Sequence, residues 1–241
     1  MRLSIVIPAF NEELYLGDCL AAVQAELGRS SLGESVEVIV IDNASTDRTA
    51  AVAQQFPNVR VVFEPVKGLT HARQRGLKEA NGDVLAFVDA DTMMPAGWID
   101  RVLEAFDSKK EIVCVSGPYI YYDGPPIWSF LIRIYWVFLA TPAYWVTGFM
   151  VVGGNFAVRK ESLVQIGGFD TCIEFYGEDT NIARRLADVG KVKFLLRLAM
   201  FTSARRLHNE GLCKMAVKYC SSFLSEVIFK RSPSRSYFDI R

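Results

Sequence analysis

The first half of the chain alternates short, almost wholly apolar runs with segments in which apolar residues recur at helical intervals. The runs are those expected of strands buried on both faces of a sheet, and they cover residues 3–9, 36–41, 59–63 and 84–88. Between them, residues such as Leu16, Leu20 and Val23 return with the period of a helix. This alternation predicts an α/β fold in which a mainly parallel, Rossmann-like sheet carries helices on both faces. Ligands of such sheets bind beyond the carboxyl ends of the strands.

The second half of the chain is less regular. The pattern predicts a helix over residues 95–108 and a strand over residues 112–116. Residues 134–158 contain no charged side chain, so by length alone they could cross a bilayer, which needs about 20 apolar residues. Because Pro142 interrupts this segment, we expect a helix that ends near Ala140 and is followed by a buried segment. A helix at a membrane surface is the alternative, since the segment is rich in tryptophan and tyrosine.

Composition narrows the class of protein. The chain has 241 residues, 51% of them hydrophobic, so it can form a sizeable core and is not a disordered chain. Its 27 basic residues balance its 27 acidic residues, which argues against a nucleic-acid-binding protein. Five scattered cysteines and two histidines give no zinc-finger or disulfide pattern, and we expect the thiols to be reduced in the cytosol.

Acidic residues follow three of the predicted strands. Glu12 comes after the first strand, Asp42 after the second, and Asp89 and Asp91 after the fourth. Because the ends of parallel strands meet at one edge of a sheet, these carboxylates would repel one another unless a cation or a ligand's donors compensated them. Asp89 and Asp91 stand two apart in an extended segment and can face one ligand. Such hard oxygen donors suit Mg²⁺ or Mn²⁺ bound together with phosphate oxygens.

Four segments of the chain resemble the motifs of the family 2 glycosyltransferases, which have the GT-A fold. They follow the family's order and are residues 4–13, 40–47, 82–91 and 176–186. The resemblance implies inverting transfer of a sugar from a UDP- or GDP-linked donor to a hydroxyl of a glycan or a lipid-linked acceptor, with Mn²⁺ or Mg²⁺ as the cofactor. We expect one catalytic domain over residues 1–231 and a polar tail over residues 232–241. Within the domain we expect a nucleotide-binding half (1–94), an acceptor-side half (95–207) and a C-terminal helix (208–231).

The resemblance also implies roles for residues on the donor side. The wall that holds the nucleoside would be formed by Pro8, Ala9, Phe10 and Glu12. Glu12 would reach the ribose, and Asp42 would contact the edge of the base. Arg73 would contact the nucleotide or pair with the acidic loops, the other interpretation being a solvated helix residue. Asp89 would lie near the ribose or the metal, and Asp91 would ligate the metal and the diphosphate.

On the acceptor side, Asp179 matches the family's general base. A base is needed there because the acceptor hydroxyl must lose its proton as it attacks the anomeric carbon, and a single displacement requires no enzyme nucleophile. Glu178 and Asp179 would also suit the N-terminus of the helix that follows, where acids are favoured, and both roles can hold together. Gly154 and Asn155 resemble a turn of small residues below the acceptor site.

Three residues near the end of the chain resemble parts of the donor and metal sites. Arg205 and Arg206 resemble basic residues that bind the donor's diphosphate. His208 would complete the metal site, as in some relatives, or would be an ordinary surface histidine. The aromatic segment 127–149 could contact a membrane surface. The basic residues of the C-terminal helix could lie against anionic lipid, or they could be solvated positions on a packed helix. We therefore expect a cytoplasmic protein, which either segment could attach to the inner face of the membrane.

Two other functions fit the same fold. One is a nucleotide-sugar-binding scaffold without turnover, against which the intact acidic positions argue. The other is a nucleotidyltransferase, which normally carries a basic, glycine-rich loop after the first strand. Here residues 9–13 are acidic and lack glycine. The sequence therefore favours sugar transfer, but it identifies neither the sugar nor the acceptor nor the oligomeric state.

Overall fold

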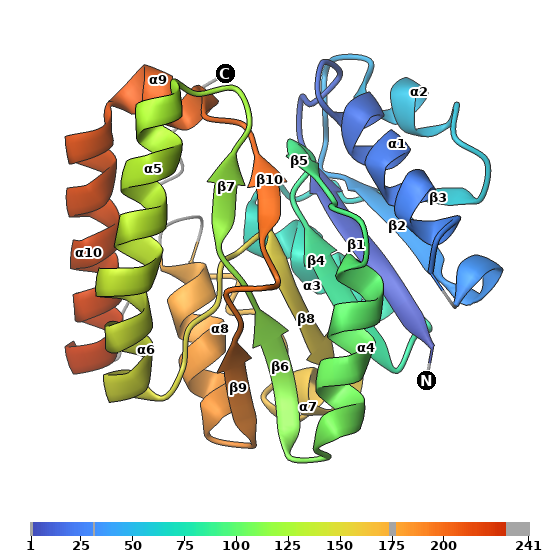
Figure 1. The fold of residues 1–241 in the computed structure, drawn as a ribbon. Coiled ribbons are helices and arrows are strands. Elements are labelled where there is room, and N and C mark those ends of the chain that lie inside the picture. The colour runs from blue at the N-terminus through green and yellow to red at the C-terminus, as the bar shows by residue number, and fades with distance from the viewer. Residues whose placement is uncertain (1, 31, 174–176, 230–241) are drawn as a thin grey trace.

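A seven-stranded sheet forms the centre of the molecule (Figure 1). The structure is a computed structural model, and it describes residues 2–30, 32–173 and 177–229. Within these residues β8 is the one strand of the sheet that runs antiparallel to its neighbours. In sheet order the strands are β3 (Val59–Phe63), β2 (Glu37–Asp42), β1 (Leu3–Ala9), β4 (Val84–Val88), β8 (Asn155–Arg159), β6 (Ile112–Ser116) and β9 (Lys191–Phe194). The predicted α/β class with a mainly parallel sheet is confirmed.

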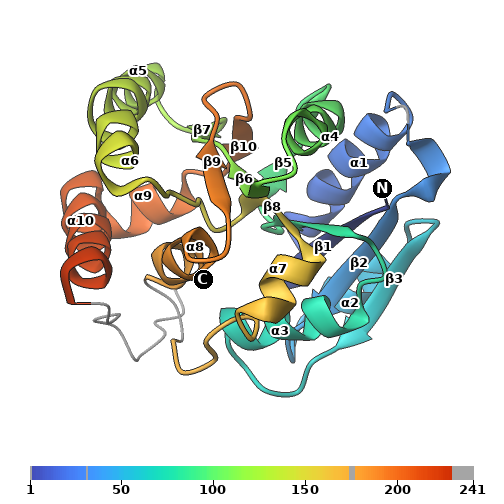
Figure 2. The same ribbon diagram turned by 90° about the horizontal axis from the view of Figure 1, so that it is seen from below.

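Helices cover both faces of this sheet, as predicted, because its strands are buried on both sides (Figure 2). One face packs against α1 (Leu16–Leu27), α2 (Thr49–Ala53) and α4 (Trp98–Ser108). The other face packs against α3 (Leu69–Glu79), α7 (Lys160–Gln165) and α8 (Glu178–Ala187). A short 3-10 turn, η1 (Gly33–Ser35), precedes β2. The result is a three-layer arrangement, and ligands of such sheets bind beyond the carboxyl ends of the strands.

A second, smaller sheet joins segments that are far apart in the sequence. Its order is β5 (Thr92–Met93), β10 (Met200–Thr202) and β7 (Tyr119–Tyr121). β5 begins directly after Asp91, and its Thr92 pairs with Thr202 of β10. The N–H of Ser203 donates to the carbonyl of Asp91 at 3.2 Å. This sheet therefore brings the chain just before α9 to the end of β4.

An outer layer of helices lies beside the small sheet (Figure 1). It consists of α5 (Pro126–Tyr135), the π-helical turn η2 (Trp136–Ala140), α6 (Thr141–Thr147), α9 (Arg205–Glu210) and α10 (Leu212–Phe229). The region expected to be one helix over residues 208–231 holds the end of α9 and all of α10, with Gly211 between them. Residues 230–231 and the expected tail lie outside the described residues. α10 packs on α8 through the buried Glu226, which accepts from Asn181 Nδ2 at 2.9 Å and from Arg184 Nε at 3.2 Å.

The expected helix end near Ala140 is wrong. Helical structure continues from Pro126 to Thr147, and Pro142 lies directly after the π-helical turn η2, at the start of α6. The expected burial is also wrong for this part. By length and composition alone, the helix over Pro126–Thr147 could cross a membrane, and little of it is buried in the structure. The chain becomes buried only further on, at Val151 and Val152 and in β8.

Candidate functional site

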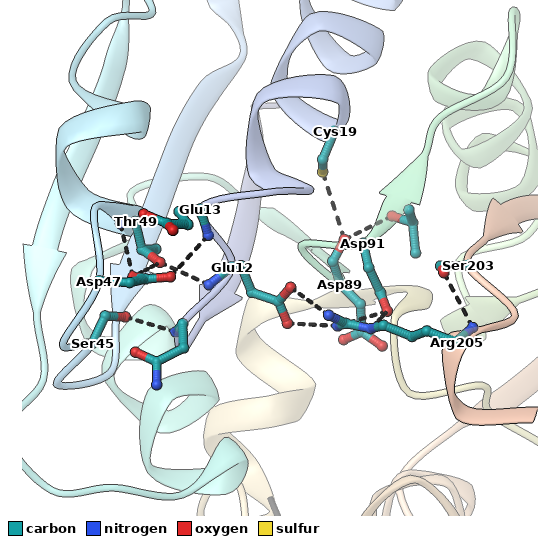
Figure 3. Close-up of polar contacts among 12 residues, drawn as sticks. Glu12, Glu13, Cys19, Ser45, Asp47, Thr49, Asp89, Asp91, Ser203 and Arg205 are labelled. Atoms are coloured by element: carbon teal, nitrogen blue, oxygen red, sulfur yellow. Dashed lines mark hydrogen bonds and ion pairs between the residues drawn. The ribbon is translucent and has the colours of Figure 1, made fainter. Parts of the chain in front are cut away.

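The loops that follow β1 and β2 are fastened to each other at the carboxyl edge of the sheet. The N–H of Asn11 donates to Ser45 Oγ at 3.1 Å, and Asn11 Oδ1 accepts from the Thr46 N–H at 2.8 Å. The N–H of Glu13 donates to Asp47 Oδ2 at 3.1 Å (Figure 3). The side chains of these loops thus satisfy backbone donors that a helix or sheet would otherwise pair, which fixes the loops in place.

Residues proposed for the nucleoside wall lie in and just after β1. Pro8 and Ala9 are buried in the strand and pair with Ile41 and Asp42 of β2. Phe10 is half-buried, and Lys67 Nζ lies 4.7 Å from the centre of its ring, within the range of a cation–π contact. The edge therefore presents an aromatic ring and a lysine beside the acidic loops.

Asp42 ends β2 and is almost completely buried, and its Oδ1 accepts from the N–H of Ser45 at 3.1 Å. Its neighbour Asn43 has a structural role. The Asn43 amide donates to the carbonyl of Val66 at 2.6 Å and accepts from the N–H of Gly68 at 2.8 Å. These bonds hold the connection between β3 and α3 against the end of β2.

Asp89 follows β4 and is held by two partners. Arg73 Nη2 lies 3.3 Å from its Oδ1, and the Tyr119 hydroxyl donates to its Oδ2 at 3.0 Å. Gly154 lies directly against both, since a Cβ there would be 2.1 Å from Asp89 Cγ and 2.1 Å from the Tyr119 oxygen. A glycine at this position is therefore required for the close approach of the backbone to Asp89.

Arg73 joins the acid that follows β4 to the acids that begin α8. Its side chain is 1% exposed, and besides Asp89 it contacts Glu178 Oε1 at 3.3 Å and donates to the carbonyl of Gly153 at 2.7 Å. Burial lowers the pKa of Arg73, but the charges of Asp89 and Glu178 outweigh burial and raise the pKa above its usual value. Arg73 is thus a charged, buried residue paired with the acidic loops, and it is not a solvated helix residue.

Glu178 and Asp179 begin α8, directly after Gly177, whose φ of 92° favours glycine. Asp179 Oδ1 accepts from the N–H of Thr180 at 2.7 Å, so this carboxylate does bind the first turn of its own helix. Burial raises the pKa of Asp179 above its usual value, against the Thr180 hydrogen bond and the Arg73 charge. Burial and the neighbouring Asp179 raise the pKa of Glu178 to about 8. The acids at this helix end are therefore stronger bases than exposed carboxylates.

Arg205 bridges the ends of β1 and β4 (Figure 3). Its Nη1 and Nη2 donate to the two carboxylate oxygens of Glu12 at 2.8 and 2.6 Å. Its Nε and Nη2 lie 3.0 and 2.9 Å from Asp91 Oδ2. Burial lowers the pKa of Arg205, but the hydrogen bonds with Glu12 and the charge of Asp91 raise it well above its usual value. Burial raises the pKa of Asp91, and Arg205 offsets this only in part.

Two of the expected site residues have other surroundings. The Asn155 amide lies in the core, where it donates to the carbonyls of Leu198 at 2.7 Å and Pro118 at 3.2 Å and accepts from Trp98 Nε1 at 2.9 Å. His208 is exposed, and its ring lies 4.8 Å from that of Trp128. Arg206, the neighbour of Arg205, is half-buried.

The carboxylates at the end of β4 are of the kind that divalent metals take as ligands. In the described part of the chain, no group of three or more histidine, cysteine, aspartate or glutamate side chains is placed to hold an ion, so His208 does not form such a group with Asp89 and Asp91. Mg²⁺ and related ions are commonly bound by one or two carboxylates together with substrate phosphates. Asp89 and Asp91 supply that number of carboxylates.

Two residues of the site had no signal in the sequence. Tyr119 supplies its hydroxyl to Asp89 from β7 in the irregular second half, and no strand was predicted over the residues of β7. Cys19 lies beneath the same loop, with its Sγ 3.6 Å from the carbonyl of Asp89, and burial raises its pKa to about 12. This thiol is neutral near pH 7 and is not a nucleophile.

Known proteins of the same architecture transfer sugars. The profile of the family described as "Glycosyl transferase family 2" matches residues 4–167. The chain therefore belongs to glycosyl transferase family 2, and the expected family is confirmed. It is 34% identical over 120 residues to the dolichol-phosphate mannosyltransferase of Pyrococcus furiosus, a match that covers 48% of this chain and 33% of that protein.

Solved structures show the same fold. The mannosyltransferase PcManGT of Pyrobaculum calidifontis, in complex with GDP-Man and Mn²⁺, aligns with a TM-score of 0.66 at 20% identity over 91% of this chain and 64% of that one. TarS 1–349 of S. aureus, in complex with UDP-GlcNAc, aligns with a TM-score of 0.65 at 17% identity over 84% of this chain and 58% of that one. The GT-A fold is thereby confirmed. The chain spans a third or less of the first three curated relatives it matches.

Proposed function

We propose that this chain is an inverting glycosyltransferase that transfers a sugar from a UDP- or GDP-linked donor to a hydroxyl of a glycan or a lipid-linked acceptor. The observation that supports this most is the buried Arg73, which contacts Asp89 on the donor side and Glu178 on the acceptor side at 3.3 Å each. One guanidinium thus joins the acids that follow β4 to those that begin α8. Family membership and two neighbours solved with nucleotide sugars support the donor class.

In this proposal Asp179 is the general base. The acceptor oxygen attacks the anomeric carbon while Asp179 takes the hydroxyl proton, and the bond from that carbon to the diphosphate breaks with its electron pair on the diphosphate. The raised pKa of Asp179 suits the role, since an efficient base has a pKa nearer the working pH. Attack and departure on opposite faces invert the anomeric centre. Gly154 lets the backbone approach Asp89 closely beneath this region.

The donor would lie along the carboxyl edge of β1, β2 and β4. Pro8, Ala9, Phe10 and Glu12 would form the nucleoside wall, and Asp42 would contact the base. Arg205 and Arg206 would face the diphosphate. Asp89 and Asp91 would hold Mn²⁺ or Mg²⁺, whose chemistry when bound is to neutralise the charge of the leaving diphosphate. A neighbour's structure contains Mn²⁺, which supports a divalent metal as cofactor.

A donor panel tests this function. Purified protein is incubated with UDP- and GDP-sugars, Mn²⁺ and a mixture of glycan and lipid-linked acceptors, and release of the nucleoside diphosphate is measured. We expect acceptor-dependent release of UDP or GDP from at least one donor. A scaffold would bind a donor without releasing a diphosphate, and a nucleotidyltransferase would instead release pyrophosphate from a nucleoside triphosphate and a sugar phosphate. Either result would overturn the proposal.

We also propose that the protein is peripheral at the inner face of the membrane and binds through the segment 127–149. The helix over Pro126–Thr147 presents large apolar side chains to solvent, and the most exposed are Ile127, Phe130, Leu139, Phe138, Trp145 and Val146. Its opposite side packs inward, where Trp128 and Ile132 cover Ala204, Leu207 and Met215. Residues 126–147 contain Arg133 and no acidic residue, which suits an anionic lipid surface.

A further inference from the structure

The bridge formed by Arg205 occupies the residue that the proposed metal needs. Arg205 lies within 3.0 Å of Asp91 Oδ2, and the same guanidinium is held by both oxygens of Glu12. The Arg205 guanidinium also lies over the ring of Tyr15 at 4.6 Å. Three elements that are distant in the sequence therefore fix one cation against Asp91: the loop after β1, the end of β4 and the start of α9.

The bridge is partly shielded from water, so the positive charge of Arg205 acts strongly on any cation that approaches Asp91. The side chain of Arg205 is 18% exposed, that of Glu12 4% and that of Asp91 12%. A divalent cation that approaches Asp91 meets a positive charge about 3 Å from the same carboxylate. Coulomb repulsion at this distance is strong where water is partly excluded. Asp91 cannot serve both cations fully, because both oxygens of Glu12, the other acid beside the guanidinium, are already engaged by Arg205.

A donor's diphosphate supplies a further anion that Arg205 does not yet engage. Arginine binds phosphate oxygens through its planar fork, as it binds carboxylates. A diphosphate at the carboxyl edge of the sheet offers Arg205 a new partner and offers the metal further oxygen ligands. We infer that Arg205 is an internal counter-cation that blocks Asp91 from divalent metal until a nucleoside diphosphate binds. The inference rests on the proposed function and adds to it an order of binding, in which metal and nucleotide enter together.

Mn²⁺ titrations of the nucleotide-free protein test this inference. Binding is followed by the electron paramagnetic resonance signal of free Mn²⁺ in the wild type and in Arg205→Gln. We expect Arg205→Gln to bind Mn²⁺ about tenfold more tightly than the wild type or better, since a competing charge is removed. Added UDP or GDP should tighten Mn²⁺ binding strongly in the wild type and much less in Arg205→Gln, because the variant has no guanidinium for the diphosphate to draw away from Asp91. Mn²⁺ should tighten nucleotide binding by the same factor, since the coupling is reciprocal.

Control variants assign the effect to this bridge. Arg197→Gln removes the same charge from an exposed ion pair with Glu104 and should leave Mn²⁺ binding unchanged. Asp91→Asn added to Arg205→Gln should abolish the gain. Arg205→Lys keeps the charge but loses the fork, so its nucleotide-free Mn²⁺ affinity should lie between the other two; it also serves if Arg205→Gln does not fold.

Two results would overturn the inference. One is equal nucleotide-free Mn²⁺ affinity in the wild type and the Arg205 variants, and the other is a gain that survives Asp91→Asn. The readout is metal binding without turnover, so the inference can fail while the donor panel shows sugar transfer. If the donor panel failed instead, the metal titrations would still report whether Arg205 blocks Asp91.

Discussion

Among single residues, Glu178 makes the stability of the fold depend on pH, because its pKa differs between the folded and unfolded states. Its pKa is raised to about 8 by burial and by Asp179, whereas an unfolded glutamate has its ordinary pKa of 4.5. In the window between these values the folded protein holds a proton that the unfolded chain has lost. Raising the pH through the window therefore favours unfolding, and stability is lost as the pH approaches about 8.

We predict that Glu178→Gln removes part of this pH dependence. Between acid and mildly alkaline pH, the unfolding free energy of the wild type should fall by at least about 1.4 kcal/mol more than that of the variant. This is the free energy that corresponds to one unit of pKa. Urea unfolding at a series of pH values measures this. Glu104→Gln, whose side chain is 63% exposed, should keep the wild-type slope. Parallel pH profiles for the wild type and Glu178→Gln would show that Glu178 is not the group responsible.

The sequence predicted some site residues better than others. Short motifs of consecutive residues contain Asp89, Asp91 and Asp179, so these acids can be recognised from the sequence alone. Tyr119, by contrast, reaches Asp89 only because β7 and β10 pair, and nothing local in the sequence indicates that pairing. The same holds for the bridge of Arg205 to Glu12, which joins residues 193 positions apart. Contacts made by tertiary folding have no local signal.

Among the helices and strands, the helix over Pro126–Thr147 shows why the apolar pattern could not predict which segments are buried. Its inner side packs against α9 and α10, and its outer side is also apolar. Uniformly apolar sequence predicts burial in a protein core as well as contact with a membrane, so the pattern could not separate the two. Large side chains of this helix lie at the surface, and Phe138 is 73% and Trp145 74% exposed.

We predict that replacing Phe138 and Trp145 by serine together weakens binding to anionic vesicles by about tenfold or more, because each large apolar side chain contributes about 1.5–3 kcal/mol on burial. Flotation with phosphatidylcholine vesicles, with and without phosphatidylglycerol, measures this. A matched variant with Leu14 and Val164 replaced by serine, at 78% and 56% exposure elsewhere on the surface, should bind as the wild type does.

Two outcomes would contradict membrane docking. The wild type would fail to float with anionic vesicles, or all variants would float equally. If the wild type were instead a dimer by light scattering and the Phe138 and Trp145 variant a monomer, the apolar face would bind a second copy of the chain.

At the scale of the whole molecule, the mainly parallel sheet decides where the chemistry can be. The order β3-β2-β1-β4 brings the loops after β1, β2 and β4 to one edge, and the alternation of strands and helices was enough to predict this. The small sheet of β5, β10 and β7 was not predicted, because its strands are two or three residues long and carry no period. That sheet brings Arg205 to the acidic edge.

In the proposed mechanism, Asp179 removes the acceptor's proton at a site shared with the donor. The most direct measurement is the acceptor-dependent turnover of Asp179→Asn at saturating donor, with donor affinity measured by calorimetry as its control. We predict that turnover falls by about 10²–10⁴-fold or more, the contribution of a positioned base, while donor affinity stays within a few-fold of the wild type. Turnover close to that of the wild type would contradict the account.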